Sequence, residues 1–180
     1  IRIIHQGRHH EPYEKKQSVL QLLKVLDQWV QILDNSNNNI DTIYLDFQKA
    51  FDTVPHKRLT KKLEGYGIHN QTLDWVTDFL SDREQRVSVN GVLSDPAPVT
   101  SGIPQGSVLG PALFVLYIND LPDEIENLVY MFADDTKIFS IVNNTNDAKR
   151  LQSDLTKLEN WSKKWLLSFN AGKCKVLQMG

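Results

Sequence analysis

The sequence predicts an α+β fold, in which an antiparallel sheet is backed by helices. Short runs rich in β-branched and aromatic residues indicate strands, and segments in which apolar residues recur every three or four positions indicate helices. Along the chain these elements follow one another as strand, helices, hairpin, helix and strand, and this order favours a sheet with helices packed behind it.

The composition limits the classes of protein to which the chain can belong. Its 180 residues are 41% hydrophobic, which is enough apolar material for the core of one or two domains. The net charge of -2 gives no overall basic field that would indicate a nucleic-acid partner. Cys174 is the single cysteine, which excludes an internal disulfide and a cysteine zinc site, and no apolar run is long enough to span a bilayer.

The sequence predicts five helices, from the helical spacing of apolar residues, from capping residues and from one apolar run. They are expected over residues 17–33, from a cap at Asp52 or Thr53 to Gly65, over 71–80, over 108–119 and over 146–166. The segment 108–119 has almost no polar face, so it predicts a helix buried in the core.

Strands are predicted over residues 40–47, 128–132 and 138–142, and from a loop at 169–173 to Met179. Asn90-Gly91 lies between two further strand-like runs and is the strongest short hairpin signal in the chain.

An acidic pair, Asp134-Asp135, lies at the tip of a predicted hairpin. Taken alone, such a pair is most simply a solvated acidic turn. However, Asp46 stands at the end of another apolar strand, where a carboxylate is costly unless it is paired or bound to a metal. If these strands are neighbours, three carboxylates converge on one end of a sheet. That arrangement is typical of a site for two cations, ~4 Å apart, that catalyses phosphoryl transfer.

Three longer blocks resemble a known family. They are Tyr44 to Asp52 (YLDFQKAFD), Ser101 to Pro111 (SGIPQGSVLGP) and Phe132 to Asp135 (FADD). In this order and spacing they resemble the reverse transcriptases of non-LTR retrotransposons of the Jockey and chicken-repeat type, over about residues 17–180.

The resemblance implies a right-hand polymerase fold, with an antiparallel palm sheet, fingers, and a thumb that is absent and expected beyond Gly180. It assigns residues 1–40 to an N-terminal part of the fingers and 41–52 to a palm strand. Residues 53–98 would form fingers helices and a hairpin, and 99–180 the rest of the palm.

The resemblance also implies a catalytic metal site. Asp46, Asp134 and Asp135 are the expected catalytic carboxylates. With the backbone carbonyl of Phe47, they are also the expected ligands of two Mg²⁺ ions.

Four residues match positions that bind substrate in the family. Phe51 would exclude a ribose 2′-hydroxyl, and Gln105 and Gly106 would border the nascent base pair. Lys173 would act as a general acid toward pyrophosphate. Simpler roles stay open: Phe51 could fill the core, Gly106 could serve a turn, and Lys173 could be a solvated loop lysine.

Three further positions match the family. Asp52 is left outside the catalytic set, because a role as helix cap explains it. Arg83 and Arg86 match an Arg-x-x-Arg stretch in the fingers and could meet template phosphates or form salt bridges at the surface.

The predicted activity is that of an RNA-directed DNA polymerase, a nucleotidyltransferase that adds deoxynucleotides to a DNA primer on an RNA template. The alternatives are an inactive retroelement remnant that folds or binds nucleic acid, and another palm nucleotidyltransferase such as an RNA-dependent RNA polymerase. Phe51 argues against an RNA polymerase, which must admit the 2′-hydroxyl.

The expected partners follow from the resemblance. They are an RNA template, a DNA primer and deoxynucleoside triphosphates, with no membrane. The chain is expected to be part of a longer retroelement polyprotein with an endonuclease, and to be intracellular, in the nucleus or a cytoplasmic ribonucleoprotein.

Overall fold

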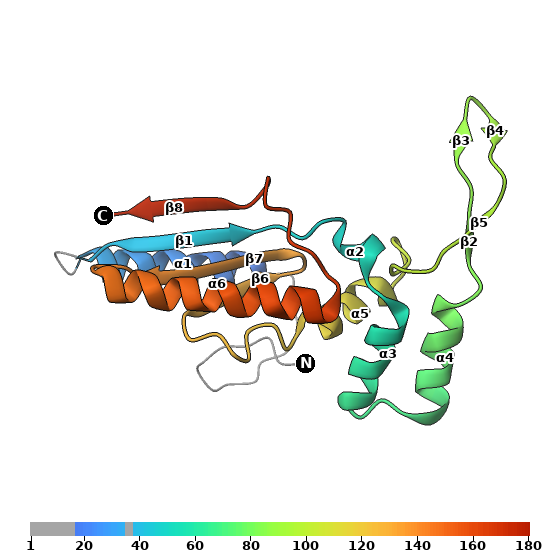
Figure 1. The fold of residues 1–180 in the computed structure, drawn as a ribbon, viewed down its shortest axis with the longest axis horizontal. Coiled ribbons are helices and arrows are strands. Elements are labelled where there is room, and N and C mark those ends of the chain that lie inside the picture. The colour runs from blue at the N-terminus through green and yellow to red at the C-terminus, as the bar shows by residue number, and fades with distance from the viewer. Residues whose placement is uncertain (1–16, 35–37) are drawn as a thin grey trace. The chain divides into compact units, whose positions relative to one another are not determined.

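A computed structural model describes residues 17–34 and 38–180 of the chain (Figure 1). Residues 1–16, which belong to the expected N-terminal part of the fingers, lie outside the described residues. The chain divides into two compact units. The first holds the described residues up to Phe47 with Leu121–Ser162 and Phe169–Gly180, and the second holds Gln48–Asp120 and Lys163–Ser168. The assignment of residue ranges to palm and fingers stays a prediction.

The first unit is built on a four-stranded antiparallel sheet, as predicted. Its strands are β1 (Ile40–Leu45), β6 (Leu128–Phe132), β7 (Asp135–Ile141) and β8 (Lys175–Met179). Their order across the sheet is β6-β7-β1-β8, so β1 is flanked by β7 and β8.

The central strand β1 is buried on both faces. The alternation in the sequence predicts one apolar and one polar face, yet Thr42 and Ile43 are both buried. Helix α1 (Gln17–Asp34) explains the difference, because Val25 packs with Ile40 and Phe139 in one apolar cluster on this sheet. Neighbouring strands and a covering helix thus bury residues that the sequence pattern places at a surface.

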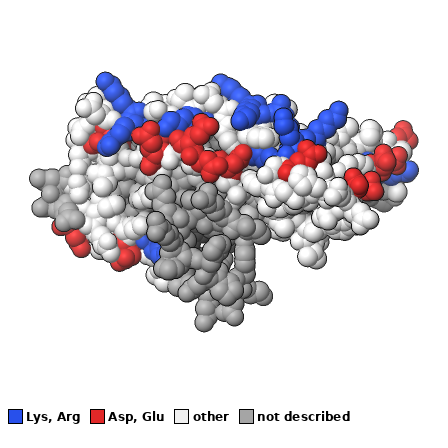
Figure 2. Space-filling view, turned by 90° about the horizontal axis from the view of Figure 1, so that it is seen from below, with Lys and Arg blue, Asp and Glu red and all other residues white. Residues whose placement is uncertain are grey.

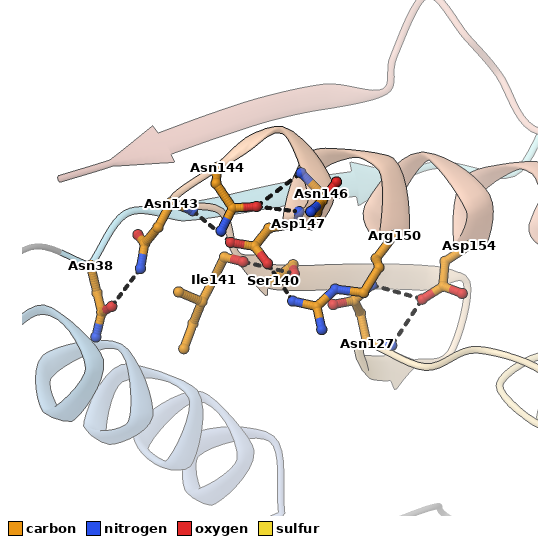
Figure 3. Close-up of polar contacts among 10 residues, drawn as sticks. All are labelled: Asn38, Asn127, Ser140, Ile141, Asn143, Asn144, Asn146, Asp147, Arg150 and Asp154. Carbon is orange, nitrogen blue, oxygen red and sulfur yellow. Dashed lines mark hydrogen bonds and ion pairs between the residues drawn. The ribbon is translucent and has the colours of Figure 1, made fainter.

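Helix α6 (Thr145–Trp165) begins at an asparagine cap (Figure 3). Oδ1 of Asn144 accepts hydrogen bonds from the N–H groups of Asn146 and Asp147 at 2.9 and 3.1 Å. The Asp147 carboxylate in turn accepts one from the Asn143 N–H at 3.1 Å. These bonds satisfy donors that the first helical turn leaves without intrahelical partners. Asn143 also donates to Asn38 at 2.7 Å, which joins the start of α6 to the segment before β1.

Asp154 of α6 is fully buried and anchors the segment that precedes β6. Its Oδ2 accepts hydrogen bonds from the backbone N–H groups of Glu126 and Asn127 at 3.0 and 2.8 Å, and its Oδ1 lies 3.0 Å from Nζ of Lys157. Burial alone would raise the pKa of Asp154. The hydrogen bonds from Asn127, Lys157 and Glu126 outweigh burial and lower this pKa below its usual value. The carboxylate is therefore held in its charged form.

The second unit consists of helices and a projecting hairpin. Its helices are α2 (Ala50–Thr53), α3 (His56–Gly65), α4 (Asn70–Leu80) and α5 (Leu109–Ile118). The hairpin strands are β2 (Glu84–Gln85), β3 (Ser88–Val89), β4 (Val92–Leu93) and β5 (Ala97–Pro98). Asn90 and Gly91 form the predicted turn with φ of 52° and 82°. Leu113, Phe114 and Tyr117 of α5 are buried, which confirms the predicted core helix on that side, whereas Val108 just before it is 95% exposed.

The predicted cap of α3 is wrong. The helix begins at His56, Pro55 precedes it, and no side chain of the described residues caps it. Lys49 adopts a left-handed backbone with φ of 48° and starts the separate short helix α2, which contains both Asp52 and Thr53. The hydroxyl of Thr53 instead donates to the carbonyl of Lys49 at 3.1 Å.

A buried lysine joins three parts of the second unit. Nζ of Lys62, on α3, donates to the backbone carbonyl of Tyr117 and to the carboxylate of Asp120, both at 2.5 Å. The same nitrogen lies 3.9 Å from the centre of the Trp165 ring, a distance typical of a cation–π contact. The ammonium group is thus paired by charge, hydrogen bonds and an aromatic face, which offsets the cost of its burial.

None of the helices in residues 17–34 and 38–180 combines the length and the apolar character that crossing a membrane would require. Figure 2 shows Lys and Arg side chains next to Asp and Glu side chains on the face in view, in line with the near balance of charges in the sequence.

Candidate active site

The register of the sheet brings the predicted carboxylates to the same end of two neighbouring strands. Leu45, the last residue of β1, lies opposite Thr136 of the antiparallel strand β7. Asp46 follows Leu45 and Asp135 precedes Thr136, so both stand at the same end of the paired strands. Asp134 directly precedes Asp135. The condition that the sequence left open, that these strands are neighbours, is therefore met.

The turn that carries Asp134 has a strained backbone. Phe132 of β6 pairs with Asp135 of β7, which leaves Ala133 and Asp134 as a two-residue connection. Ala133 has a φ of 52°, in the left-handed region that favours glycine over a residue with a Cβ. Strain of this kind persists only where the surrounding structure fixes it, and it is concentrated at functional sites. Asp134 is exposed at this turn.

Asp46 carries a buried oxygen without a hydrogen bond. Its side chain is 37% exposed, yet its Oδ1 is buried and has no hydrogen-bond partner among the described residues. Nζ of Lys173 lies 3.7 Å from this oxygen. Lys173 is itself 67% exposed, so this ion pair contributes little to stability. A buried carboxylate oxygen that accepts no hydrogen bond from the described residues is a ready ligand for a cation.

Lys173 reaches Asp46 because the turn before β8 is attached to the end of β1. The backbone N–H of Asn170 donates to the carbonyl of Asp46 at 2.8 Å, and the N–H of Lys173 donates to the carbonyl of Asn170 at 2.9 Å. Beside them, the rings of Phe47 and Phe169 stack with their centres 4.7 Å apart. The structure therefore brings Lys173 to the predicted carboxylate, although the two residues are far apart in the sequence.

The types of donor atom at this end of the strands suit a hard divalent cation. Carboxylate and backbone carbonyl oxygens are the ligands that Mg²⁺ prefers, and the buried Oδ1 of Asp46 is an available one. Within residues 17–34 and 38–180, no three His, Cys, Asp or Glu side chains are gathered closely enough to hold a metal ion. Repulsion between neighbouring carboxylates opposes closer gathering unless a cation supplies the opposite charge.

In the second unit, hydrogen bonds hold the loop 101–106 against the segment that carries Phe51. The backbone N–H of Ile103 donates to the carbonyl of Phe51 at 2.7 Å, and that of Gly102 donates to the carbonyl of Val54 at 2.9 Å. Gly102 has a φ of +89°, and a Cβ there would lie 2.7 Å from the carbonyl oxygen of Asp52. Only glycine permits this close approach.

The ring of Phe51 is supported on one side and partly exposed. It stacks on the buried ring of Phe114, with a centroid distance of 4.6 Å and an interplanar angle of 26°. The residue is only half-buried. These contacts suit both of the roles that the sequence left open, since the ring packs on the core and still offers some surface to a ligand.

Gln105 and Gly106 are exposed in the loop. Nε2 of Gln105 donates a hydrogen bond to Oδ1 of Asp52 at 3.0 Å. Gly106 has a φ of +81°, and a Cβ there would meet no described atom within 4 Å, so its backbone conformation rather than crowding calls for glycine. At Gly110, by contrast, a Cβ would lie 2.8 Å from the carbonyl oxygen of Pro104, which shows a packing role.

Arg83 supports the loop from within the unit. Its Nη2 donates to the carbonyl of Gly102 at 2.8 Å and its Nε to the carbonyl of Leu80 at 3.1 Å. Nε2 of His56 also lies 2.8 Å from the Gly102 carbonyl oxygen. Neither interpretation that the sequence left open for Arg83, a template phosphate or a surface salt bridge, describes these contacts. No sequence signal could have found them, because the acceptors are backbone carbonyls.

Comparison with known proteins places the chain in a family. The family described as reverse transcriptase (RNA-dependent DNA polymerase) matches residues 2–179. The chain is 34% identical over 166 residues to the RNA-directed DNA polymerase from the mobile element jockey of Drosophila melanogaster, covering 86% of this chain and 18% of that protein. It is 36% identical over 143 residues to the jockey polymerase of Drosophila funebris, covering 73% of this chain and 15% of that protein. The chain thus spans less than a fifth of these curated relatives.

Solved structures show the same fold. Telomerase from Candida tropicalis, in complex with a fragment of telomeric RNA, matches 93% of this chain and 30% of its own, with a TM-score of 0.68 and 13% identity. Apo telomerase from the same organism, truncated from its C-terminal domain, matches with a TM-score of 0.62 and 15% identity, covering 93% and 36%. These likenesses confirm the predicted right-hand polymerase fold. Since the family match extends over almost the whole sequence, the chain belongs to the reverse transcriptase (RNA-dependent DNA polymerase) family.

Proposed function

We propose that this chain is the core of an RNA-directed DNA polymerase, which adds deoxynucleotides to a DNA primer on an RNA template. The observation that carries the proposal is the pairing of β1 with β7 in a chain of the reverse transcriptase family. Because of this pairing, Asp46 and the pair Asp134-Asp135 stand at the same end of the two strands. In this reaction the primer 3′-hydroxyl attacks the α-phosphorus of a deoxynucleoside triphosphate. A new P–O bond forms, and pyrophosphate leaves.

Asp46, Asp134, Asp135 and the backbone carbonyl of Phe47 are the proposed ligands of two Mg²⁺ ions. Divalent cations bound there supply positive charge at the attacking and leaving oxygens. The task of the chain is to keep the anionic oxygens in place, which suits the end of a buried central strand and a two-residue turn. Lys173, 3.7 Å from Asp46, is the proposed general acid that gives a proton to the leaving pyrophosphate.

Three residues of the second unit are proposed to select the nucleotide. The ring of Phe51, supported by Phe114, would collide with a ribose 2′-hydroxyl and so favour deoxynucleotides. Gln105 and Gly106 would border the nascent base pair, where an exposed amide and a backbone without a side chain allow close approach of a base.

The proposed partners are an RNA template, a DNA primer and deoxynucleoside triphosphates. Further relatives carry names of retrotransposable elements and Pol polyproteins, and the telomerase neighbour was solved with RNA. We propose by analogy that the chain works within a longer retrotransposon polyprotein that includes an endonuclease. Its proposed location is the nucleus or a cytoplasmic ribonucleoprotein.

Primer extension tests the proposal. The purified chain, an RNA template with an annealed DNA primer, the four deoxynucleotides and Mg²⁺ should give products whose sequence follows the template. Asp134→Asn should abolish extension and keep the melting temperature, because the amide preserves the shape and removes the charge. Asp123→Asn, at an exposed acidic residue before β6, is the matched control and should extend normally. No extension by the wild type, or equal extension by Asp134→Asn, would overturn the proposal and favour an inactive remnant.

A further inference from the structure

Asp52 is joined to two residues that the proposed function assigns to nucleotide binding. It follows Phe51 directly in the chain, and its Oδ1 accepts a hydrogen bond from Nε2 of Gln105 at 3.0 Å. The capping role that the sequence suggested for it is absent, because α3 begins after Pro55 without a side-chain cap from the described residues. The carboxylate thus has a partner that the cap interpretation does not explain.

A carboxylate determines which end of an amide faces it. An ionised carboxylate only accepts hydrogen bonds, whereas a glutamine amide donates from Nε2 and accepts at Oε1. Asp52 therefore selects the orientation in which Nε2 points toward it and Oε1 is directed elsewhere. Without such a partner, the terminal torsion of a glutamine is broad and roughly two-fold, so donor and acceptor can exchange places.

The backbone of Asp52 is fixed by the same loop that carries Gln105. Its N–H donates to the carbonyl of Lys49 at 2.9 Å, and its carbonyl accepts a hydrogen bond from Oγ of Ser101 at 3.0 Å. Gly102 lies so close that a Cβ there would approach the Asp52 carbonyl oxygen to 2.7 Å. The Cα of Asp52 therefore has little freedom, and its short side chain directs the carboxylate toward Gln105.

We propose that Asp52 is a positioning residue for nucleotide selection, which acts by fixing the orientation of the Gln105 amide. The inference rests on the proposed function of Gln105 at the nascent base pair. Asp52 itself does not touch the nucleotide. It makes Gln105 present an acceptor of defined position, and it couples the loop 101–106 to the segment that bears Phe51.

Incorporation kinetics with a double-mutant cycle test this role. Asp52→Ala should raise the KM for the deoxynucleotide about tenfold and leave kcat nearly unchanged. The variant loses the charge-assisted hydrogen bond to Gln105, which affects nucleotide binding and does not involve the reacting groups. Asp52→Asn should fall in between, since its Oδ1 can still accept the bond but its Nδ2 can also face Oε1 of Gln105. In a Gln105→Ala background, Asp52→Ala should add no further change in KM. Asp74→Ala, at an exposed position of α4, is the matched control and should keep the wild-type KM.

A second readout does not depend on activity. The side-chain NH₂ signals of Gln105 in ¹⁵N–¹H spectra should shift, and their hydrogen exchange should accelerate, in Asp52→Ala but not in Asp74→Ala. Unchanged Gln105 signals would overturn the inference, as would a KM effect of equal size in the Gln105→Ala background, which indicates a merely structural role.

The two readouts separate this inference from the proposed function. If the wild-type chain extends no primer, the proposed function fails, and the role of Asp52 in nucleotide selection fails with it. The spectra then still decide whether Asp52 orients Gln105. If the wild type extends primers and the Asp52 variants keep the wild-type KM, as the Asp74→Ala control does, the inference alone is overturned.

Discussion

Replacing Phe51 with valine separates a role in nucleotide selection from a role in packing. The ring stacks on the buried Phe114 at 4.6 Å, and such pairs are worth ~0.5–1.5 kcal/mol beyond the area that they bury. Because Phe51 is only half-buried, the total loss should lie near the lower end of the ~1–5 kcal/mol known for shortened core residues. Losing a tenfold preference for deoxynucleotides corresponds to ~1.4 kcal/mol of barrier.

The assay is the ratio of kcat/KM for ribo- and deoxynucleotides in wild type and Phe51→Val. We expect this ratio to rise at least about tenfold while the deoxynucleotide efficiency falls much less, because the variant removes a clash with the 2′-hydroxyl. Phe114→Leu is the control, because it removes the supporting ring and keeps Phe51. It should lower the free energy of unfolding and change the ribo- to deoxynucleotide ratio little. An unchanged ratio, with both efficiencies lower, would mean that Phe51 only fills the core, and it would reopen the RNA polymerase alternative.

Two predictions concern the stability of the two units. Asp154→Asn should destabilise the chain by about 3 kcal/mol at pH 7, because a fully buried carboxylate loses its charge-assisted hydrogen bonds. Since folding lowers its pKa below 3.8, this contribution is complete above that pH and is lost as the pH falls through the lower folded value, so urea unfolding of wild type and variant should converge in acid. Gly102→Ala should cost more than ~2 kcal/mol, because it adds a steric clash to an unfavourable φ, whereas Gly106→Ala, with a similar φ and no crowding, should cost ~1 kcal/mol. Equal effects of the two glycine variants in thermal unfolding would contradict the close approach at Gly102.

Much of the fold could be predicted because periodicity reflects burial directly. The helices expected from their periodicity over 71–80 and 146–166 begin and end within one residue of α4 and α6, and the apolar run over 108–119 does so for α5. The cap at Asp52 or Thr53 failed because a left-handed residue, Lys49, opens a separate turn before α3. A lysine has no particular preference for that conformation, so the sequence carries no signal for it.

The candidate site was only partly predictable. A carboxylate at the end of each of two apolar elements indicates a shared site only if the strands pair, and strand pairing is a tertiary property. The roles of Lys62 and Arg83 could not be predicted, because both side chains bind backbone carbonyls that are remote in the sequence. Lys62 also stands beside Lys61 in a run typical of a solvated helix face, yet it is buried against Trp165.

We propose that Asp46, Asp134 and Asp135 bind divalent cations at one end of the paired strands. Paramagnetic Mn²⁺ broadens the NMR signals of nuclei close to it, so a titration at low Mn²⁺ locates the site without requiring activity. We expect the backbone signals of these three aspartates to broaden first, excess Mg²⁺ to restore them, and Asp46→Asn to abolish the selective broadening. Broadening centred on other residues, or the same pattern in Asp46→Asn, would show that these aspartates do not form the cation site.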